Sequence, residues 1–350
     1  MVTAQALAPL SDIHMRLANR RRSVTLGLGF LLLLTFATAL YLGDYPVPPA
    51  GVVQSLLSPF TGLTDKGVDF IVLNVRLPRT VLAVLTGAAF ALSGLIFQTL
   101  LRNPLASPDI IGISHGASAS AVVCIILFGF TGIAVSLGAL LGAVLTALVI
   151  YALSWRGGVT SYRVVLIGIG MAAIMSAVMS YVFTRARLVE VQQALAWLVG
   201  SLNATTGNDL APLALAMVVL LPMTVVLTRA LRALQLGDDT AKALGVKVEF
   251  VRLGLILVAV AYAAFATAAV GPVTFVAFVS GPIARSLLAG SGDGFTQSAL
   301  VGALVMLGSD LVAQHALPSV QLPVGVVTGV FGACFLLWLL AVSNRAGRVN

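Results

Sequence analysis

RLPRTVLAVLTGAAFALSGLIFQTLLRNPLASPDIIGISHGASAS, residues 76–120, decides the fold class of this chain. In this stretch, an apolar run stands between two arginines and an Asn-Pro-Leu-Ala turn, and about 20 such residues cross a bilayer core. Similar runs recur along the 350 residues, of which 59% are hydrophobic and only 9% charged. Soluble domains carry about 25% charged residues. The composition therefore excludes a soluble protein and predicts an all-α, polytopic membrane protein.

The apolar runs predict a single membrane domain over residues 24–342, with an N-terminal tail at 1–23 and a C-terminal tail at 343–350. About ten transmembrane helices are expected, at 24–43, 79–101, 112–130, 132–154, 163–184, 210–232, 250–271, 273–290, 296–314 and 324–342.

Basic residues predict the orientation, because cytoplasmic segments of membrane proteins are richer in Lys and Arg. With the N-terminus inside, 15 of the 20 basic residues fall in inner segments. Both termini are therefore expected in the cytoplasm. The net charge of +8 is then a property of the membrane surface and requires no nucleic-acid partner.

The residues that would support catalysis or metal binding are sparse. Cys124 and Cys334 lie in predicted membrane helices, and the three histidines stand in separate segments without ligand spacing. The Gly-x-x-x-x-Gly-Lys-Ser/Thr loop that holds nucleotide phosphates does not occur in the sequence. We therefore expect no metal site, no cofactor on this chain and no enzymatic activity of its own.

Arg76 and Arg79 are the first candidate binding residues. They stand three apart around Pro78, at the expected start of a helix, so both guanidinium groups should share one face. Their outer position runs against the charge bias of the chain. Two interpretations are open: the side chains reach lipid phosphates, or they bind carboxylates of a soluble partner through paired hydrogen bonds.

A loop at about 234–248 is the second candidate. Asp238 or Asp239 can cap a short helix there, and Gly245 can end it in the left-handed conformation. Ala241 and Leu244 should share one apolar face, which could insert into a groove of another protein. An ordinary loop between two helices is the other interpretation.

Two features inside predicted helices also suggest function. Met171, Met175 and Met179 follow one another at helical spacing and would suit either core packing or a soft pathway for bulky ligands. Asp310 is the carboxylate that lies well inside an apolar run, where such groups are costly and often functional. It could be a hydrogen-bonded structural residue or a proton carrier.

Several blocks, in order from about 68 to 340, resemble the permease subunit of ATP-driven bacterial importers for iron–siderophores, haem and cobalamin. The blocks are Arg76-Leu-Pro-Arg79, Asn103-Pro-Leu-Ala106, Gly112-Ile-Ser-His-Gly116, Leu236-Gly-Asp-Asp-Thr-Ala-Lys-Ala-Leu-Gly245, Gly271-Pro-Val-Thr-Phe-Val-Ala-Phe-Val-Ser-Gly-Pro-Ile-Ala-Arg285, Asp310-Leu-Val-Ala and Leu322-Pro-Val-Gly-Val-Val-Thr-Gly329. The resemblance implies two permease subunits of ten helices each, identical or merely similar, two cytoplasmic ATPases that bind ATP and Mg, and a substrate-binding protein outside.

The resemblance also implies roles for particular residues. Arg76 and Arg79 would dock the binding protein, with Gln314 at the position where some members carry a further arginine. The coupling helix on the ATPase would comprise Gly237, Asp238, Asp239, Thr240, Ala241, Leu244 and Gly245. The pathway and its inner gate would include Asn103, Leu105, Thr160, Ser161, Met171, Met175 and Met179.

These features predict a permease subunit of an ATP-binding-cassette importer in the bacterial cytoplasmic membrane, moving a ferric siderophore inward. Cobalamin or haem is the alternative substrate within the same family. From other classes, a secondary transporter driven by an ion gradient would use Asp310, and a channel-like protein would leave Arg76 and Arg79 without a task.

Overall fold

The structure is a computed structural model that describes residues 4–43, 45–62, 65–156, 160–203, 207–317 and 320–346. Its elements are α1 (Ala4–Tyr41), α2 (Pro49–Thr61), α3 (Lys66–Asp69), the π-helix η1 (Phe70–Arg76), α4 (Leu77–Leu100), α5 (Ile113–Ile126), α6 (Ile133–Ser154), α7 (Ser161–Arg185), α8 (Leu188–Leu198), α9 (Gly207–Gln235), α10 (Asp238–Ala243), α11 (Val248–Val270), α12 (Val276–Leu288), α13 (Phe295–His315) and α14 (Val324–Ala346).

Each of the ten predicted ranges overlaps one observed helix, which confirms the all-α, polytopic prediction. Among the described residues, seven helical stretches are long and apolar enough to cross a membrane, and α5 and α12 are shorter apolar helices. One of the short ones, α12, begins later than we predicted. Gly271 and Phe275 have φ angles of 79° and 68°, and Pro272 follows Gly271, so the chain stays extended until Val276.

The predicted N-terminal tail is helical from Ala4, because α1 begins well before the expected span, and it ends at Tyr41, two residues before the expected end. We did not predict α2, α3, η1 and α8, which occupy the segments assigned to outer loops. α3 and η1 run without interruption into α4, so that one helical stretch covers Lys66–Leu100. The spanning helices were predicted from apolar runs long enough to cross a bilayer. These four elements are short or amphipathic and contain no such run.

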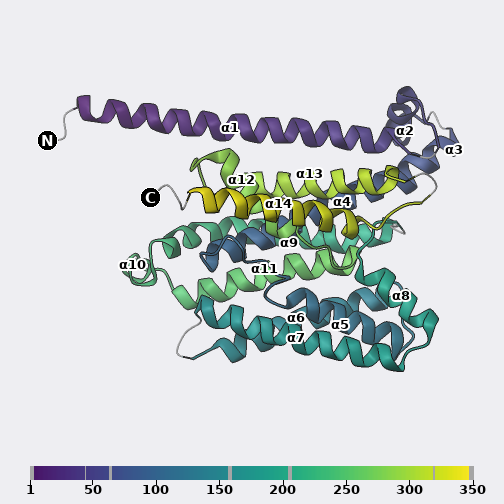
Figure 1. Cartoon of the computed structure of the whole chain (residues 1–350). Coiled ribbons are helices and arrows are strands. Elements are labelled where there is room, and N and C mark those ends of the chain that lie inside the picture. The colour runs from purple at the N-terminus through teal and green to yellow at the C-terminus, as the bar shows by residue number, and fades with distance from the viewer. Residues whose placement is uncertain are drawn as a thin grey trace.

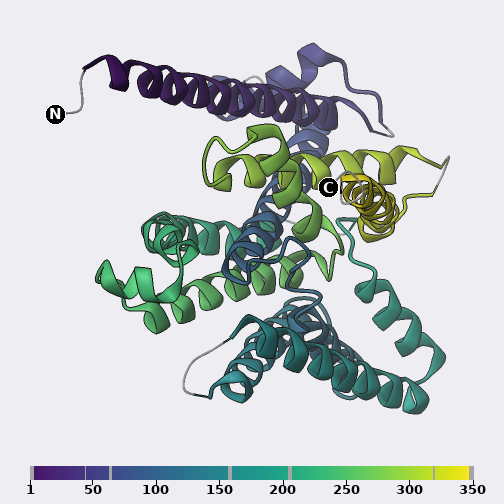
Figure 2. The same cartoon turned by 60° about the vertical axis from the view of Figure 1, so that its left-hand side comes forward.

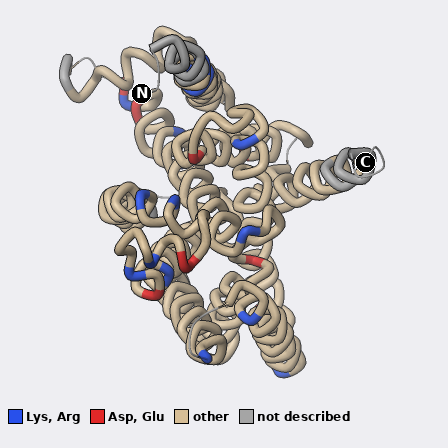
Figure 3. The backbone as a smooth tube through the Cα atoms, turned by 90° about the vertical axis from the view of Figure 1, so that its left-hand side faces the viewer, with Lys and Arg blue, Asp and Glu red and all other residues tan. Residues whose placement is uncertain are grey.

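The helices run side by side between two ends of a bundle (Figure 1). α10 marks one end, where α1 begins and α14 ends; α2, α3 and α8 mark the other, the α8 end. α5, α6 and α7 form a group on the side of the bundle away from α1, which is also clear in the turned view (Figure 2). Lys and Arg residues occur on several elements at the α10 end (Figure 3).

α4 is the most enclosed spanning helix, with 83% of its apolar window buried. It packs on α13, α12, α11 and α9. A side chain added at Gly94 would overlap the Ala277 carbonyl oxygen in α12, and one added at Gly87 would overlap the Gly302 carbonyl in α13. Lipid provides no hydrophobic drive for helices to associate, so close backbone approach at small residues holds these interfaces.

This packing predicts that Gly302→Ala destabilises the protein, whereas Gly308→Ala on the same helix does not. A methyl group at Gly302 would overlap Gly87 and Ala91 in α4, while nothing lies within 4 Å of the position it would take at Gly308. Overpacking of this kind costs about 1–3 kcal/mol. Thermal unfolding of the purified chain in detergent measures the difference, and equal midpoints for the two variants would contradict the interface.

Candidate functional site

Arg76 fastens the end of α1 at the α8 end of the bundle. Its guanidinium is buried and donates to the carbonyl oxygens of Leu40 at 2.8 Å, Tyr41 at 2.9 Å and Tyr45. The last carbonyls of a helix have no partner within the helix, and a cation there is favourable. Arg76 therefore stabilises the junction between α1 and the segment that follows.

Arg79 points to a different neighbour, so the two guanidinium groups do not share the face that we predicted. It pairs with Asp310 of α13, with Nη2 at 2.8 Å from Oδ1 and Nε at 3.0 Å from Oδ2. Its remaining hydrogen bonds go to Asn203 Oδ1 at 2.8 Å and Gln321 Oε1 at 3.2 Å. The start of α4, the loop before α9, and α13 with the loop that follows it therefore meet at this side chain.

Asp310 is satisfied on all sides by this cluster. Its side chain is 2% exposed and that of Arg79 is 13% exposed. Gln314, one turn further along α13, donates from Nε2 to Asp310 Oδ2 at 2.8 Å. Such contacts are what a structural carboxylate in a membrane helix requires, and they account for Asp310 without a proton-carrying role. Docking by Arg76, Arg79 and Gln314 stays a prediction.

At the α10 end, the predicted coupling helix forms over Asp238–Ala243 with Gly237 as its first capping residue. The prediction that Asp238 or Asp239 caps it is wrong, because neither side chain bonds the helix start. Asp238 instead accepts two hydrogen bonds from Arg252 of α11, at 3.0 and 3.1 Å. This ion pair attaches α10 to the next spanning helix.

The other end of α10 follows the prediction. Gly245 has φ of 80°; its N–H bonds the Lys242 carbonyl at 2.9 Å, and the Val246 N–H bonds the Ala241 carbonyl at 3.0 Å. This pair of backbone hydrogen bonds defines the Schellman motif. The prediction that Ala241 and Leu244 share one apolar face is wrong, however, since Ala241 is 0% exposed and Leu244 is 64% exposed. The exposed residues of α10 and the position after it are Asp239, Thr240, Lys242, Ala243 and Leu244.

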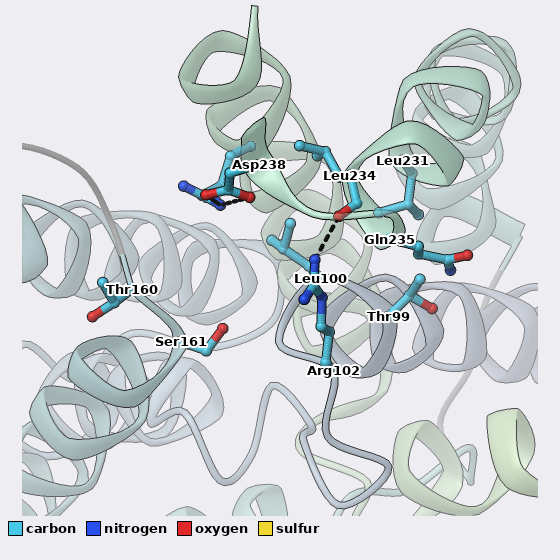
Figure 4. A pocket seen from close by; sticks show the side chains of 10 residues that line it. Thr99, Leu100, Arg102, Thr160, Ser161, Leu231, Leu234, Gln235 and Asp238 are labelled. Atoms are coloured by element: carbon cyan, nitrogen blue, oxygen red, sulfur yellow. Dashed lines mark hydrogen bonds and ion pairs between the residues drawn. The ribbon is translucent and has the colours of Figure 1, made fainter. Parts of the chain in front are cut away.

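A cavity of about 280 Å³ lies beneath α10 (Figure 4). It brings together Thr160 and Ser161 at the start of α7, Arg102 after α4, and Asp238 and Arg252. Two of the four predicted inner-gate residues therefore share one cavity with the coupling segment.

The other two predicted gate residues, Asn103 and Leu105, lie beside the cavity in the exposed turn after Arg102. The Asn103 Oδ1 atom accepts the Leu105 N–H at 2.9 Å and shapes this turn. All four predicted gate residues therefore lie at the α10 end of the bundle.

The methionine stripe of α7 is half-buried. Met171 and Met179 pack against the hydrophobic core, whereas Met175 does not belong to that contact group. Among the described residues, no group of three or more His, Cys, Asp or Glu could hold a metal ion. Core packing thus accounts for two of the three methionines, and a pathway role for the stripe stays a prediction.

The architecture and the motifs agree with known transport proteins. A family model described as the FecCD transport family matches residues 31–342. The chain belongs to the FecCD transport family. The ferric enterobactin transport system permease protein of Escherichia coli (strain K12) is 42% identical over 292 residues, covering 83% of this chain and 88% of that protein.

Two further comparisons extend over more of the chain. The vitamin B12 import system permease protein of Klebsiella pneumoniae subsp. pneumoniae is 32% identical, over 98% of this chain and 100% of that protein. A solved inward-facing conformation of a metal-chelate type ABC transporter has a TM-score of 0.80 and 26% identity, covering 91% of this chain and 99% of that one. FecCD membership confirms the predicted resemblance to importer permeases and a transport role.

Two polar features of this FecCD chain are not predictable from its sequence. In the loop after α4, Asp109 accepts a hydrogen bond from Ser114; burial raises the pKa of the Asp109 carboxyl, opposed by that bond and by nearby His115. Asn203 and Gln321 complete the surroundings of Arg79. Asp109, Asn203 and Gln321 lie in loops, where the sequence has no periodicity that would show that a polar residue is buried or paired.

The ion pair predicts an unequal result for single and double substitutions. Asp310→Ala should destabilise the protein by about 3–5 kcal/mol because it leaves the Arg79 charge without its partner. The double variant Arg79→Met/Asp310→Leu should cost less than that single change. Thermal unfolding in detergent measures both, with Asp239→Ala as the control because that carboxylate is fully exposed. Strictly additive effects would contradict the pairing.

Proposed function

We propose that this chain is a permease subunit of an ATP-binding-cassette importer that moves a ferric siderophore inward across the bacterial cytoplasmic membrane. The observation that carries the proposal is the 42% identity to a ferric enterobactin permease over most of both chains. An achromobactin transport system permease of Dickeya dadantii (strain 3937), 37% identical over 89% of this chain, supports the same substrate class.

The distribution of charge supports the proposed orientation. Most Lys and Arg residues belong to segments at the α10 end, including Arg16, Arg20, Arg21 and Arg22 of α1. The positive-inside rule assigns such an end to the cytoplasm. α10 would then face the interior of the cell and the Arg79 cluster would face outward, with both chain termini inside.

The proposed ATPase contact is the outward surface of α10. Asp239, Thr240 and Leu244 are exposed there, while Ala241 and the Asp238–Arg252 pair hold the helix to the membrane domain. A small exposed helix of this kind can enter a groove on a partner. ATP and Mg would be bound by two such ATPases, and the coupling residues of this chain would follow their movement.

The proposed binding-protein contact lies around Arg79 and Gln314. Asp310 already neutralises Arg79, so a carboxylate of the binding protein would share the guanidinium with Asp310. The Arg79 side chain is 13% exposed. Arg76 is buried, so we assign it the indirect task of holding the α1 junction in place. A second permease subunit would complete the pathway, and α7 offers it a long apolar surface with Leu166, Ile169 and Ile174 exposed.

Alternating access follows from these contacts. Movement of the ATPases would shift α10 and open either the inner gate, formed by Asn103, Leu105, Thr160 and Ser161, or the outer side. Only contacts that differ between the two states supply the drive. A cobalamin importer is the second candidate, favoured by the vitamin B12 permease that matches 98% of this chain.

Uptake into proteoliposomes tests the substrate class. The chain would be reconstituted with its partner permease, ATPase and binding protein, and radiolabelled ferric enterobactin, cobalamin and haem would be supplied with ATP. We expect ATP-dependent uptake of the ferric chelate well above that of the other two. Gln314→Glu should reduce it by repelling acidic docking residues, whereas Arg187→Glu, at an 88% exposed side chain, should not. Preferential uptake of cobalamin or haem would contradict the proposed substrate.

A further inference from the structure

Arg102 occupies an unusual backbone position at the end of α4. Its φ is 51°, in the left-handed region that residues other than glycine rarely adopt. The Asn103 N–H bonds the Gln98 carbonyl at 3.1 Å, and the Arg102 N–H bonds the Thr99 carbonyl at 3.3 Å. This is a Schellman end, whose left-handed position is usually glycine. An arginine there indicates that its side chain has a task of its own.

The side chain joins α4 to the helix that leads into α10. Arg102 Nη2 donates to the Leu234 carbonyl oxygen at 2.7 Å (Figure 4). Leu234 lies in the last turn of α9, and its carbonyl oxygen also accepts the Gly237 N–H at 3.2 Å, so Arg102 is the second donor to this oxygen. Hydrogen bonds from a charged donor are shorter and stronger than neutral ones. Leu234 also stands only three residues before Gly237, the capping residue of α10.

The start of α10 is therefore held by two arginines from two other elements. Arg102 binds the backbone before it, and Arg252 binds Asp238 within it. Both arginines line the cavity that contains Thr160 and Ser161. On its other side, Arg102 is followed directly by the Asn103–Leu105 turn, whose shape depends on the bond between those two residues.

We propose that Arg102 is a positioning residue that transmits the movement of α10 to the Asn103–Leu105 turn. The inference rests on the proposed function, in which a partner ATPase moves α10. When α10 moves, the Leu234 carbonyl acts on Arg102 through their hydrogen bond. α4 does not follow easily, because backbone contacts to α12 and α13 hold it in place. The displacement passes instead to the turn beyond Arg102, which is exposed and free of such packing.

Arg102→Gly separates this role from a structural one, because glycine adopts the left-handed conformation without strain but lacks the hydrogen-bond donor. Arg102→Lys keeps a donor, and Arg229→Ala removes an exposed arginine from the same region of α9 as a control. Each variant is reconstituted with its partner permease, ATPase and binding protein, and uptake of ferric enterobactin is measured together with ATP hydrolysis and the thermal midpoint.

For Arg102→Gly we expect an unchanged or higher midpoint, continued ATP hydrolysis, and a fall of about tenfold in molecules transported per ATP, a size typical of coupling between distant sites. Arg102→Lys should recover most of that ratio, and Arg229→Ala should leave it unchanged. A normal ratio in Arg102→Gly, a lysine variant as poor as the glycine variant, or parallel loss of midpoint and uptake would overturn the inference. A wild-type complex without ATP-dependent uptake would overturn the proposed function instead, and the inference with it.

Discussion

Backbone contact between α4 and its neighbours is the constraint on which the rest of the structure depends. Gly94 against Ala277 and Gly87 against Gly302 leave no room for a side chain at either crossing. Because apolar helices gain little by associating in lipid, this close fit, rather than hydrophobic burial, fixes the position of α4. Arg79, near one end of α4, is thereby held at a fixed place in the bundle, whereas Arg102 lies just beyond the other end, outside these backbone contacts.

Arginine side chains with specific partners lie near both ends of that helix. At the α8 end, Arg79 and Asp310 form a closed cluster that ties α4 to α13. At the α10 end, Arg102 and Arg252 bind the segments around α10. Charged groups are costly within the bilayer, so the middle of the bundle relies on small residues and the ends carry the specific contacts through which partners would act.

The sequence predicts the spanning helices well because each requires an apolar run of sufficient length. It predicts Gly245 as the end of α10 because few other residues tolerate that backbone angle. It does not predict that Arg76 turns toward α1, that Ala241 faces inward, or that Asn203 and Gln321 meet Arg79. Those contacts depend on which helices are neighbours, and hydropathy carries no information about helix pairing. The inner-gate residues were located through family resemblance, not through residue chemistry.

The source of energy for transport is the most direct test of the account. Proteoliposomes that contain the chain with its partner permease and ATPase would be loaded with either ATP or an imposed proton or sodium gradient, in the presence of the binding protein and ferric enterobactin. The account predicts accumulation that requires ATP and is indifferent to the gradient. Accumulation driven by the gradient without ATP would contradict it and would return Asp310 to consideration as an ion-carrying residue.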